Sequence, residues 1–153
     1  MPISARYVHT NLIAQDWRRL ARFYQDVFGC IPVPPERDLH GPQFDALTSI
    51  PGARLRGMHL RLPGYGDAGP TLELFEYAPS QAKAEARVNQ HGYGHIAFEV
   101  DDVAAAYDAV VQAGGRAIGQ IVTLQIADDA QVTVCYMTDP EGNIIELQCW
   151  SRP

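Results

Sequence analysis

The sequence predicts an α+β fold built from two related halves, each containing a strand, a helix and two or three further strands. Two amphipathic helical segments support this prediction, because each is preceded by one strand-like stretch and followed by several others. The first strand and helix of the two halves also align under one shift without a gap, which pairs His9 with His95, Asp16 with Asp102 and Gly29 with Gly115, and the closing strands TLELFEY and IIELQCW share an apolar-Glu-Leu pattern. We therefore predict an internal duplication.

The first helix is predicted between Asp16 and Gly29. Asp16 suits the position before the helix, since its carboxylate accepts hydrogen bonds from free backbone N–H groups. Gly29 suits the position after it, because glycine readily adopts the left-handed conformation that ends many helices. The strand-like stretch RYVHTNLI, residues 6–13, precedes this helix. Apolar residues recur at three- and four-residue intervals and form one face: Trp17, Leu20, Ala21, Tyr24, Val27 and Phe28.

The second helix is predicted to begin at Asp101 or Asp102 and to end at Gly114 and Gly115. Its strand-like predecessor is GYGHIAFEV, residues 92–100. Its apolar face is again spaced for a helix and comprises Val103, Ala106, Tyr107 and Val110.

The remaining strands are expected after each helix, in stretches separated by turn residues. In the first half these are ARLRGMHLRL (53–62) and TLELFEY (71–77), and in the second GQIVTLQI (119–126), QVTVCYM (131–137) and NIIELQCW (143–150). The proline-rich stretch from Ile31 to Gly52 is expected to be irregular. We predict one domain over residues 1–153, made of module 6–77 and module 93–150, which are joined by the polar, alanine-rich linker 78–92.

The composition argues against several classes of protein. Hydrophobic residues make up 46% of the chain and charged residues 20%, which suits a globular core. The formal net charge of -6 is unfavourable for binding nucleic acid. No apolar run approaches the roughly 18 residues of a membrane span, and the start MPISARYVHT lacks the apolar segment of a signal peptide. We therefore expect a cytoplasmic protein, with buried thiols at Cys30, Cys135 and Cys149.

The duplication places one histidine on the first strand and one glutamate on the last strand of each half. These residues are His9 and Glu73 in the first half, and His95 and Glu146 in the second. A glutamate in an apolar strand needs a partner, and a shared divalent cation supplies one. Two imidazoles and two carboxylates suit Ni, Co, Zn, Mn or Fe better than Ca. We predict that all four residues bind one such ion, leaving two positions for water or substrate.

Other residues compete for these roles. Glu76 follows Glu73 by three positions and so faces the other side of the strand, whereas Glu99 follows His95 by four. Only Glu73 shares the sequence context of Glu146, so the repeat favours it. The remaining histidines have no counterpart in the other half, and we expect solvated or structural roles for them: His40, His59 and His91. A solvated role is also expected for Arg18, Arg19 and Arg22.

Four segments of the chain, in order, resemble the vicinal oxygen chelate superfamily: HTNL with DWRRLARFYQDVFGC, TLELFEY, YGHIAFEVDDVAAAYDAVVQAGG, and TDPEGNIIELQ. This superfamily includes glyoxalase I, methylmalonyl-CoA epimerase, extradiol dioxygenases, and fosfomycin and bleomycin resistance proteins. The resemblance covers nearly the whole chain. It implies paired βαβββ modules and an open β-barrel-like cleft, with a divalent metal held at the positions of His9, Glu73, His95 and Glu146.

The ligand set most closely resembles that of glyoxalase I. The resemblance implies a lactoylglutathione lyase-like enzyme that acts on a small-molecule substrate with vicinal oxygens, by proton transfer through a metal-stabilised enediolate. The family pattern favours Glu146 as the base, with Glu73 as the alternative. Two other functions stay open: an isomerase like methylmalonyl-CoA epimerase, and a ligand-sequestering protein like the bleomycin resistance proteins. An Fe(II) extradiol dioxygenase would need a catalytic histidine and tyrosine that the sequence does not place.

The sequence also predicts a homodimer. Each half alone offers a small sheet and one helix, which is too little to cover both faces and the edges of the sheet. The halves therefore pair within one chain or between two chains. By resemblance to glyoxalase I, we expect a metal site shared between chains.

Overall fold

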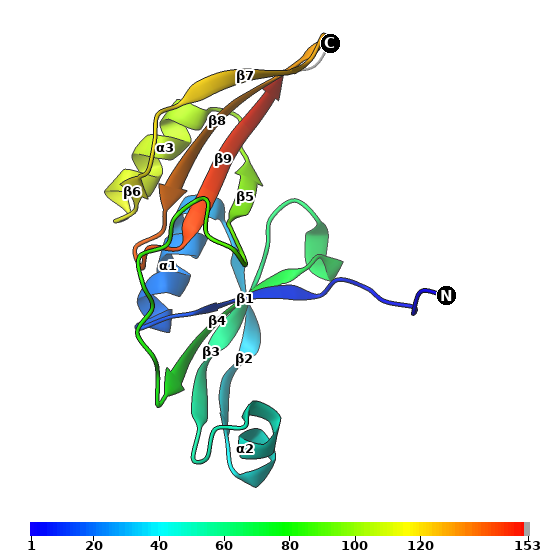
Figure 1. Ribbon diagram of the computed structural model, residues 1–153, viewed down its shortest axis with the longest axis vertical. Coiled ribbons are helices and arrows are strands. Elements are labelled where there is room, and N and C mark those ends of the chain that lie inside the picture. Colours follow the sequence, from blue (N-terminus) through cyan, green and yellow to red (C-terminus); the bar gives the residue numbers. More distant parts are fainter. Residues whose placement is uncertain (152–153) are drawn as a thin grey trace. The chain divides into compact units, whose positions relative to one another are not determined.

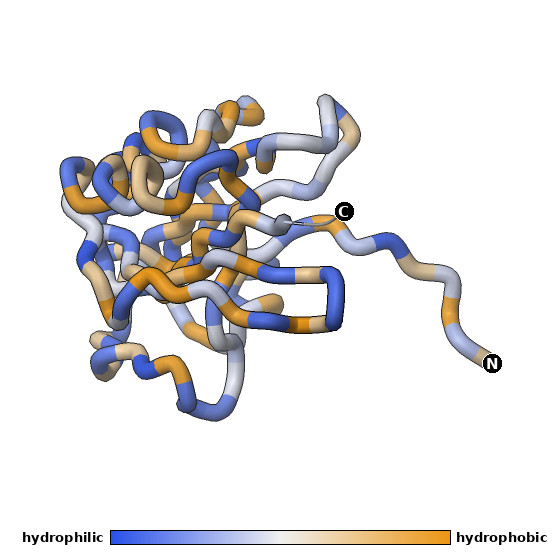
Figure 2. The backbone as a smooth tube through the Cα atoms, turned by 90° about the horizontal axis from the view of Figure 1, so that it is seen from above, coloured by the Kyte–Doolittle hydropathy of each residue, from blue (hydrophilic) through white to orange (hydrophobic). Residues whose placement is uncertain are grey.

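A computed structural model describes residues 1–151, which form two compact units, one spanning Met1–Ala82 and one starting at Lys83. Each unit contains one sheet with a helix packed on it (Figure 1). The predicted α+β class is confirmed. Hydrophobic and hydrophilic residues alternate at short intervals along the chain (Figure 2). Among the described residues, no helix has the length and apolar character needed to cross a membrane.

The first unit has a four-stranded sheet in the order β1-β4-β3-β2. Strand β1 runs parallel to β4, and the other neighbouring strands are antiparallel. Residues 1–8 precede β1 as an extended, exposed segment (Figure 1). The elements are β1 (His9–Ile13), α1 (Trp17–Phe28), β2 (Ile31–His40), α2 (Pro42–Thr48), β3 (Arg54–Arg61), the short 3-10 helix η1 (Gly66–Ala68) and β4 (Thr71–Ala78).

The second unit repeats this arrangement. Its sheet has the order β5-β9-β8-β6, with β7 also paired to β8, and its first strand again runs parallel to its last. The elements are β5 (Ile96–Glu99), α3 (Val103–Gln112), β6 (Arg116–Ala117), β7 (Val122–Ala127), β8 (Ala130–Thr138) and β9 (Ile144–Ser151).

Both helices begin as the sequence predicts. The Asp16 side chain accepts a hydrogen bond from the Arg19 backbone N–H at 3.0 Å, and Gly29 ends α1 with a φ of 68°. Asp102 caps α3 by accepting hydrogen bonds from the next backbone N–H groups, at 2.9 and 3.1 Å. Helix α3 stops at Gln112, slightly before the predicted glycines.

Helix α1 covers one face of the first sheet, where it contacts β3 and β4. Side chains alternate between the two faces of a strand, and on this face Leu60, Leu72 and Leu74 are fully buried. Helix α3 contacts β8 and β9 in the second unit in the same way. The opposite face of each sheet carries the predicted glutamate. In the first unit, Phe44 of α2 packs against Leu55 and Phe75 on this same face, at the other end of the strands.

The expectation of an irregular stretch from Ile31 to Gly52 is wrong, because these residues form β2 and α2. Proline lacks the N–H that a central strand needs, but β2 lies at the edge of its sheet and its pairing is irregular between Val33 and Arg37. Pro42 occupies the first turn of α2, where no N–H is required. Strand β6 was not predicted, because two residues are too short for a periodic pattern. The predicted linker contains no helix between residues 79 and 95.

Two of the three cysteines are buried, as predicted. Burial raises the pKa of the Cys30 thiol to about 11 and also raises that of Cys135. Both thiols are therefore held in the protonated, unreactive form at neutral pH. Cys149 is only partly buried, which corrects the expectation for this residue.

A side chain at Gly57 should destabilise the first unit. Gly57 pairs with Phe75, and a Cβ atom at Gly57 would lie only 2.1 Å from the backbone oxygen of Leu74. We expect Gly57→Ala to lower the free energy of unfolding by about 1–3 kcal/mol, because the backbone must shift to admit the methyl group. Urea denaturation measures this change. Gly94→Ala is the matched control, since a Cβ there meets no atom within 4 Å. Equal stability of the two variants would contradict the packing of β3 against β4.

Candidate metal centre

The parallel pairing of β1 with β4 brings His9 to Glu73. Asn11 is the direct partner of Glu73 in the register, and His9 lies two residues earlier on the same face of β1. The Nε2 atom of His9 lies 2.9 Å from Oε1 of Glu73. The Asn11 amide donates to the same oxygen at 3.4 Å. The structure therefore joins the two ligands predicted in the first half.

A third side chain, His59 on β3, also contacts Glu73. The antiparallel register places it directly opposite Glu73, and its Nε2 lies 2.7 Å from the second carboxylate oxygen, Oε2. The His59 Nδ1 lies 3.1 Å from the Thr71 hydroxyl oxygen. The His9 and His59 rings meet edge to face, with centroids 5.7 Å apart. The expectation of a solvated role for His59 is therefore wrong, because its side chain is only 16% exposed and contacts Glu73.

The His9, His59 and Glu73 side chains fit a transition metal ion. Their ligating atoms all lie within 4.8 Å of one another. Burial is the main cause that lowers the pKa of His59, which favours the neutral imidazole that binds metals. The Glu73 residue is only 8% exposed, so its charge needs a nearby cation or strong donors. Two imidazole nitrogens and one carboxylate are a donor set that divalent first-row metals accept.

The second unit contains the corresponding histidine–glutamate pair. The Nε2 atom of His95 lies 3.1 Å from Oε2 of Glu146. His95 immediately precedes β5 and is not part of the strand, which corrects its predicted placement. Ala97 is the direct partner of Glu146, so His95 again lies two residues before that partner, as His9 does in the first unit. The two pairs belong to different units, and a four-ligand site stays a prediction.

Tyr136 occupies in the second unit the position that His59 has in the first. It lies opposite Glu146 in the pairing of β8 with β9, and its ring centroid lies 5.0 Å from that of His95. Burial, together with the charge and hydrogen bonding of Glu146, raises the pKa of Tyr136. His59 therefore has a positional counterpart, but one of a different residue type.

An apolar cavity of about 260 Å³ borders Glu146. Its wall is formed by one face of β7, β8 and β9, and among the described residues Glu146 is the one charged residue that lines it. On this face the side chains of β7 stay largely exposed: Val122 43%, Leu124 47% and Ile126 57%. The cavity can therefore receive an apolar group next to the Glu146 carboxylate.

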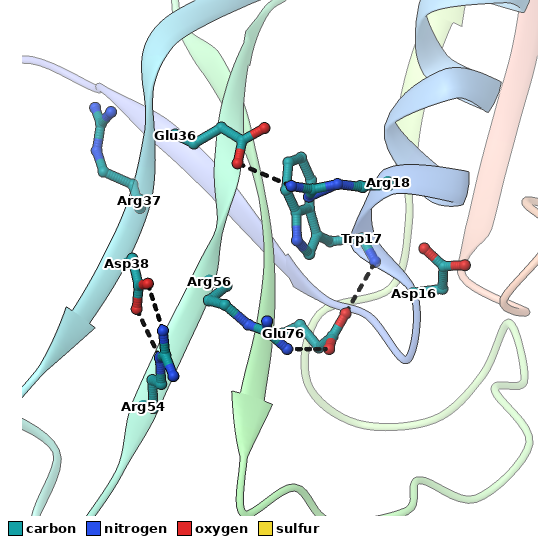
Figure 3. Close-up of a pocket in the computed structure, with 9 residues that line it drawn as sticks. All are labelled: Asp16, Trp17, Arg18, Glu36, Arg37, Asp38, Arg54, Arg56 and Glu76. Atoms are coloured by element: carbon teal, nitrogen blue, oxygen red, sulfur yellow. Dashed lines mark hydrogen bonds and ion pairs between the residues drawn. The ribbon is translucent and has the colours of Figure 1, made fainter.

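A larger cavity, of about 510 Å³, lies by the start of α1 and contains four arginines (Figure 3). Arg54 makes two hydrogen bonds to Asp38, at 2.6 and 2.8 Å, and Arg18 lies 3.0 Å from Glu36. Arg56 pairs with Glu76 at 3.5 Å, on the face of β4 away from Glu73, as predicted for Glu76. Four acidic residues balance the four arginines of this lining. The cavity is therefore poorly suited to an anionic ligand.

The chain also matches a known protein family. Residues 6–147 match the family model of the Glyoxalase/Bleomycin resistance protein/Dioxygenase superfamily. The chain belongs to this superfamily, and the resemblance read from the sequence motifs is confirmed.

Two curated relatives cover most of the chain. The first is an ethylmalonyl-CoA/methylmalonyl-CoA epimerase from Cereibacter sphaeroides, with 24% identity over 94% of this chain and 96% of the relative. The second is a lactoylglutathione lyase from Haemophilus influenzae, with 29% identity over 92% of this chain and 89% of the relative. The names of these two relatives give different activities, and both relatives have a similar sequence identity to this chain.

Solved structures with the same fold include a glyoxalase family protein from Bacillus cereus. It has a TM-score of 0.80 and 18% identity, and the match covers 97% of this chain and 96% of that protein. A fosfomycin resistance protein from Listeria monocytogenes, complexed with Mn(II) and sulfate, has a TM-score of 0.52 and 15% identity over 97% of this chain and 93% of that protein. At such identities the likeness supports the fold alone.

Proposed function

We propose that this protein is a metal-dependent lyase or isomerase that moves a proton on the carbon next to a substrate carbonyl. The observation that carries the proposal is a histidine–glutamate contact that recurs at equivalent register positions in both units, His9 with Glu73 and His95 with Glu146. The names of the two curated relatives, an epimerase and a lyase, support the same class of reaction.

The proposed ligands of one divalent ion, Ni, Zn, Co or Mn, are His9, Glu73, His95 and Glu146. When bound, the ion supplies Lewis-acid polarisation of the substrate carbonyl. The imidazoles of His9 and His95 each contact a carboxylate oxygen through Nε2. In each unit, one nitrogen atom and one oxygen atom of the proposed ligands therefore already lie close together. These donor types suit the ions named.

The surroundings of the two glutamates differ, and they favour Glu146 as the base. Both oxygens of Glu73 are engaged, one by His9 and Asn11 and the other by His59. Glu146 is also contacted, by His95 and Tyr136, but it borders the apolar cavity, where a substrate carbon can approach it. We assign to Glu146 the removal of the substrate proton and its return to the same or the adjacent carbon. We assign to Glu73 a fixed ligand role.

The lining of the cavity indicates the kind of substrate. Apolar side chains, including Val132, Val134 and Trp150, surround the approach to Glu146, and within residues 1–151 no lysine or arginine lines the cavity. We therefore propose a carbonyl compound with an apolar substituent either on the reacting carbon or on the carbonyl carbon next to it. Hemithioacetals and 2-methyl-branched acyl thioesters both meet this description. An epimerase acting on such a thioester is the second candidate, supported by the epimerase relative.

Metal analysis combined with a substrate panel tests the proposal. The purified protein should contain one divalent transition metal per set of two histidine–glutamate pairs. From a panel of hemithioacetals, 2-methyl-branched acyl-CoA esters and catechols, it should convert one of the first two classes and exchange a substrate proton with solvent deuterium. Metal-free protein that binds no added ion, or cleavage of a catechol ring, would contradict the proposal.

His95→Ala is the informative variant for this experiment. It should weaken metal binding markedly while leaving the fold intact, because it removes one ligand at the exposed start of β5. Arg54→Ala is the matched control, since its ion pair with Asp38 is exposed and far along the sheet from Glu73 in the strand register. Unchanged metal affinity in His95→Ala would remove this residue from the ligand set.

A further inference from the structure

We propose that His59 is a further metal ligand, so that His9, His59 and Glu73 form a three-ligand half-site in the first unit. This inference rests on the proposed function for the presence of a metal and deepens it by adding a residue to the same site. It predicts that the first unit retains an ion when the histidine–glutamate pair of the second unit is removed.

The distances suit three ligands of one ion. The two Nε2 atoms lie 2.9 and 2.7 Å from different oxygens of Glu73. Neighbouring ligand atoms around an ion with bonds of about 2.1 Å lie about 3 Å apart. The side chains come from three adjacent strands, β1, β4 and β3, which fix their backbone positions. An ion therefore requires only small side-chain adjustments.

A second contact orients the His59 ring. Its Nδ1 lies 3.1 Å from the Thr71 hydroxyl oxygen. An Nδ1–H group that donates to this oxygen leaves the lone pair of Nε2 directed at Glu73 and available to a metal. Metal-binding histidines usually make such an outer hydrogen bond, which fixes the tautomer. The ring is also held edge-on against Phe75, with centroids 5.7 Å apart, and its side chain is only 16% exposed.

The two units are unequal in the residue that faces the glutamate. The first unit has His59, whereas the second has Tyr136 at the equivalent register position. A neutral phenol binds divalent metals less well than imidazole does, so the stronger half-site lies in the first unit. With an ion held by His9, His59 and Glu73, the Glu146 carboxylate would be available as a base while the ion stayed bound.

Cobalt(II) titration of the full chain tests this inference, since its visible absorption reports the ligands. The starting variant is His95→Ala with Glu146→Gln, which removes the pair of the second unit. We expect it to bind one Co(II) per chain. Adding His59→Ala should weaken that binding at least about 10-fold and change the visible spectrum. Adding His91→Ala to the starting variant instead should change neither the Co(II) affinity nor the visible spectrum. This variant controls for the loss of one histidine.

His59→Gln separates a ligand from a hydrogen-bonding residue. A glutamine amide can still donate to Glu73, but it is a poor substitute for an imidazole ligand, so we expect the affinity and spectrum of the alanine variant. Co(II) binding equal to that of the starting variant, in either His59 substitution, would overturn the inference, as would absence of Co(II) binding in the starting variant. Turnover of the substrate panel by the unmodified chain tests the proposed function separately.

Discussion

Replacing Glu146 with glutamine should lower turnover by about 10²–10⁴-fold while leaving the metal bound. Glutamine keeps the size of the side chain and one ligating oxygen, but its amide cannot accept the substrate proton. Glu146 is the residue expected to accept the substrate proton, because it borders the apolar cavity. The measurements are turnover of the substrate found in the panel, exchange of its proton with deuterium, and metal content of the same sample.

Glu73→Gln is the control for the assignment of roles. The Glu73 carboxylate contacts His9 and His59 through separate oxygens, so this substitution should chiefly weaken metal binding. With excess metal added, the Glu73 variant should regain more activity than the Glu146 variant does. A metal-loaded Glu73→Gln protein without activity, together with an active Glu146→Gln protein, would show that the two roles are reversed.

The helices could be predicted because their signals are local. Asp16 and Asp102 cap helices through backbone groups only a few residues away, and Gly29 ends α1 by its own conformation. The two histidine–glutamate pairs could also be predicted, since duplication makes equivalent residues visible without knowledge of the strand order. The contacts of each pair then follow from a parallel pairing that both units share.

His59 could not be found in this way, because the repeat compares residue types. Its counterpart is Tyr136, so a search for a second histidine discards it. His59 and Tyr136 are equivalent only in position. The antiparallel register of β3 with β4, and of β8 with β9, places each of them opposite a glutamate. A loop of nine residues separates β3 from β4, and the sequence does not reveal that register. The signal available in the sequence was a histidine on the strand that comes just before the Glu73 strand.

Strand β2 was missed for a related reason. Its prolines argue against a central strand, but the sequence does not tell which strand lies at the edge of a sheet. The structure places β2 at the edge, where missing N–H groups need no partner. Local composition therefore gave the wrong expectation where the position in the sheet decides the outcome.

Two inactive variants, His9→Ala and His95→Ala, should recover activity when their subunits are exchanged. We expect a homodimer in which His9 and Glu73 of one chain act with His95 and Glu146 of the other. Exposed apolar side chains on β7, such as Leu124 and Ile126, favour burial against another surface. Linker 78–92 has about 15 residues of about 3.3 Å each, so its length permits pairing of the modules within one chain or between two chains.

The mixed dimer has a distinctive composition if the site is shared. One of its two sites lacks both histidines and the other is intact, so activity returns although neither parent is active. The two variants, carrying different affinity tags, are mixed under conditions that exchange subunits, and the doubly tagged dimer is purified and assayed. Circular dichroism of each parent establishes that the substitutions leave the fold in place. A purified mixed dimer that stays inactive would mean that each site draws all its ligands from a single chain, because every site would then lack one histidine.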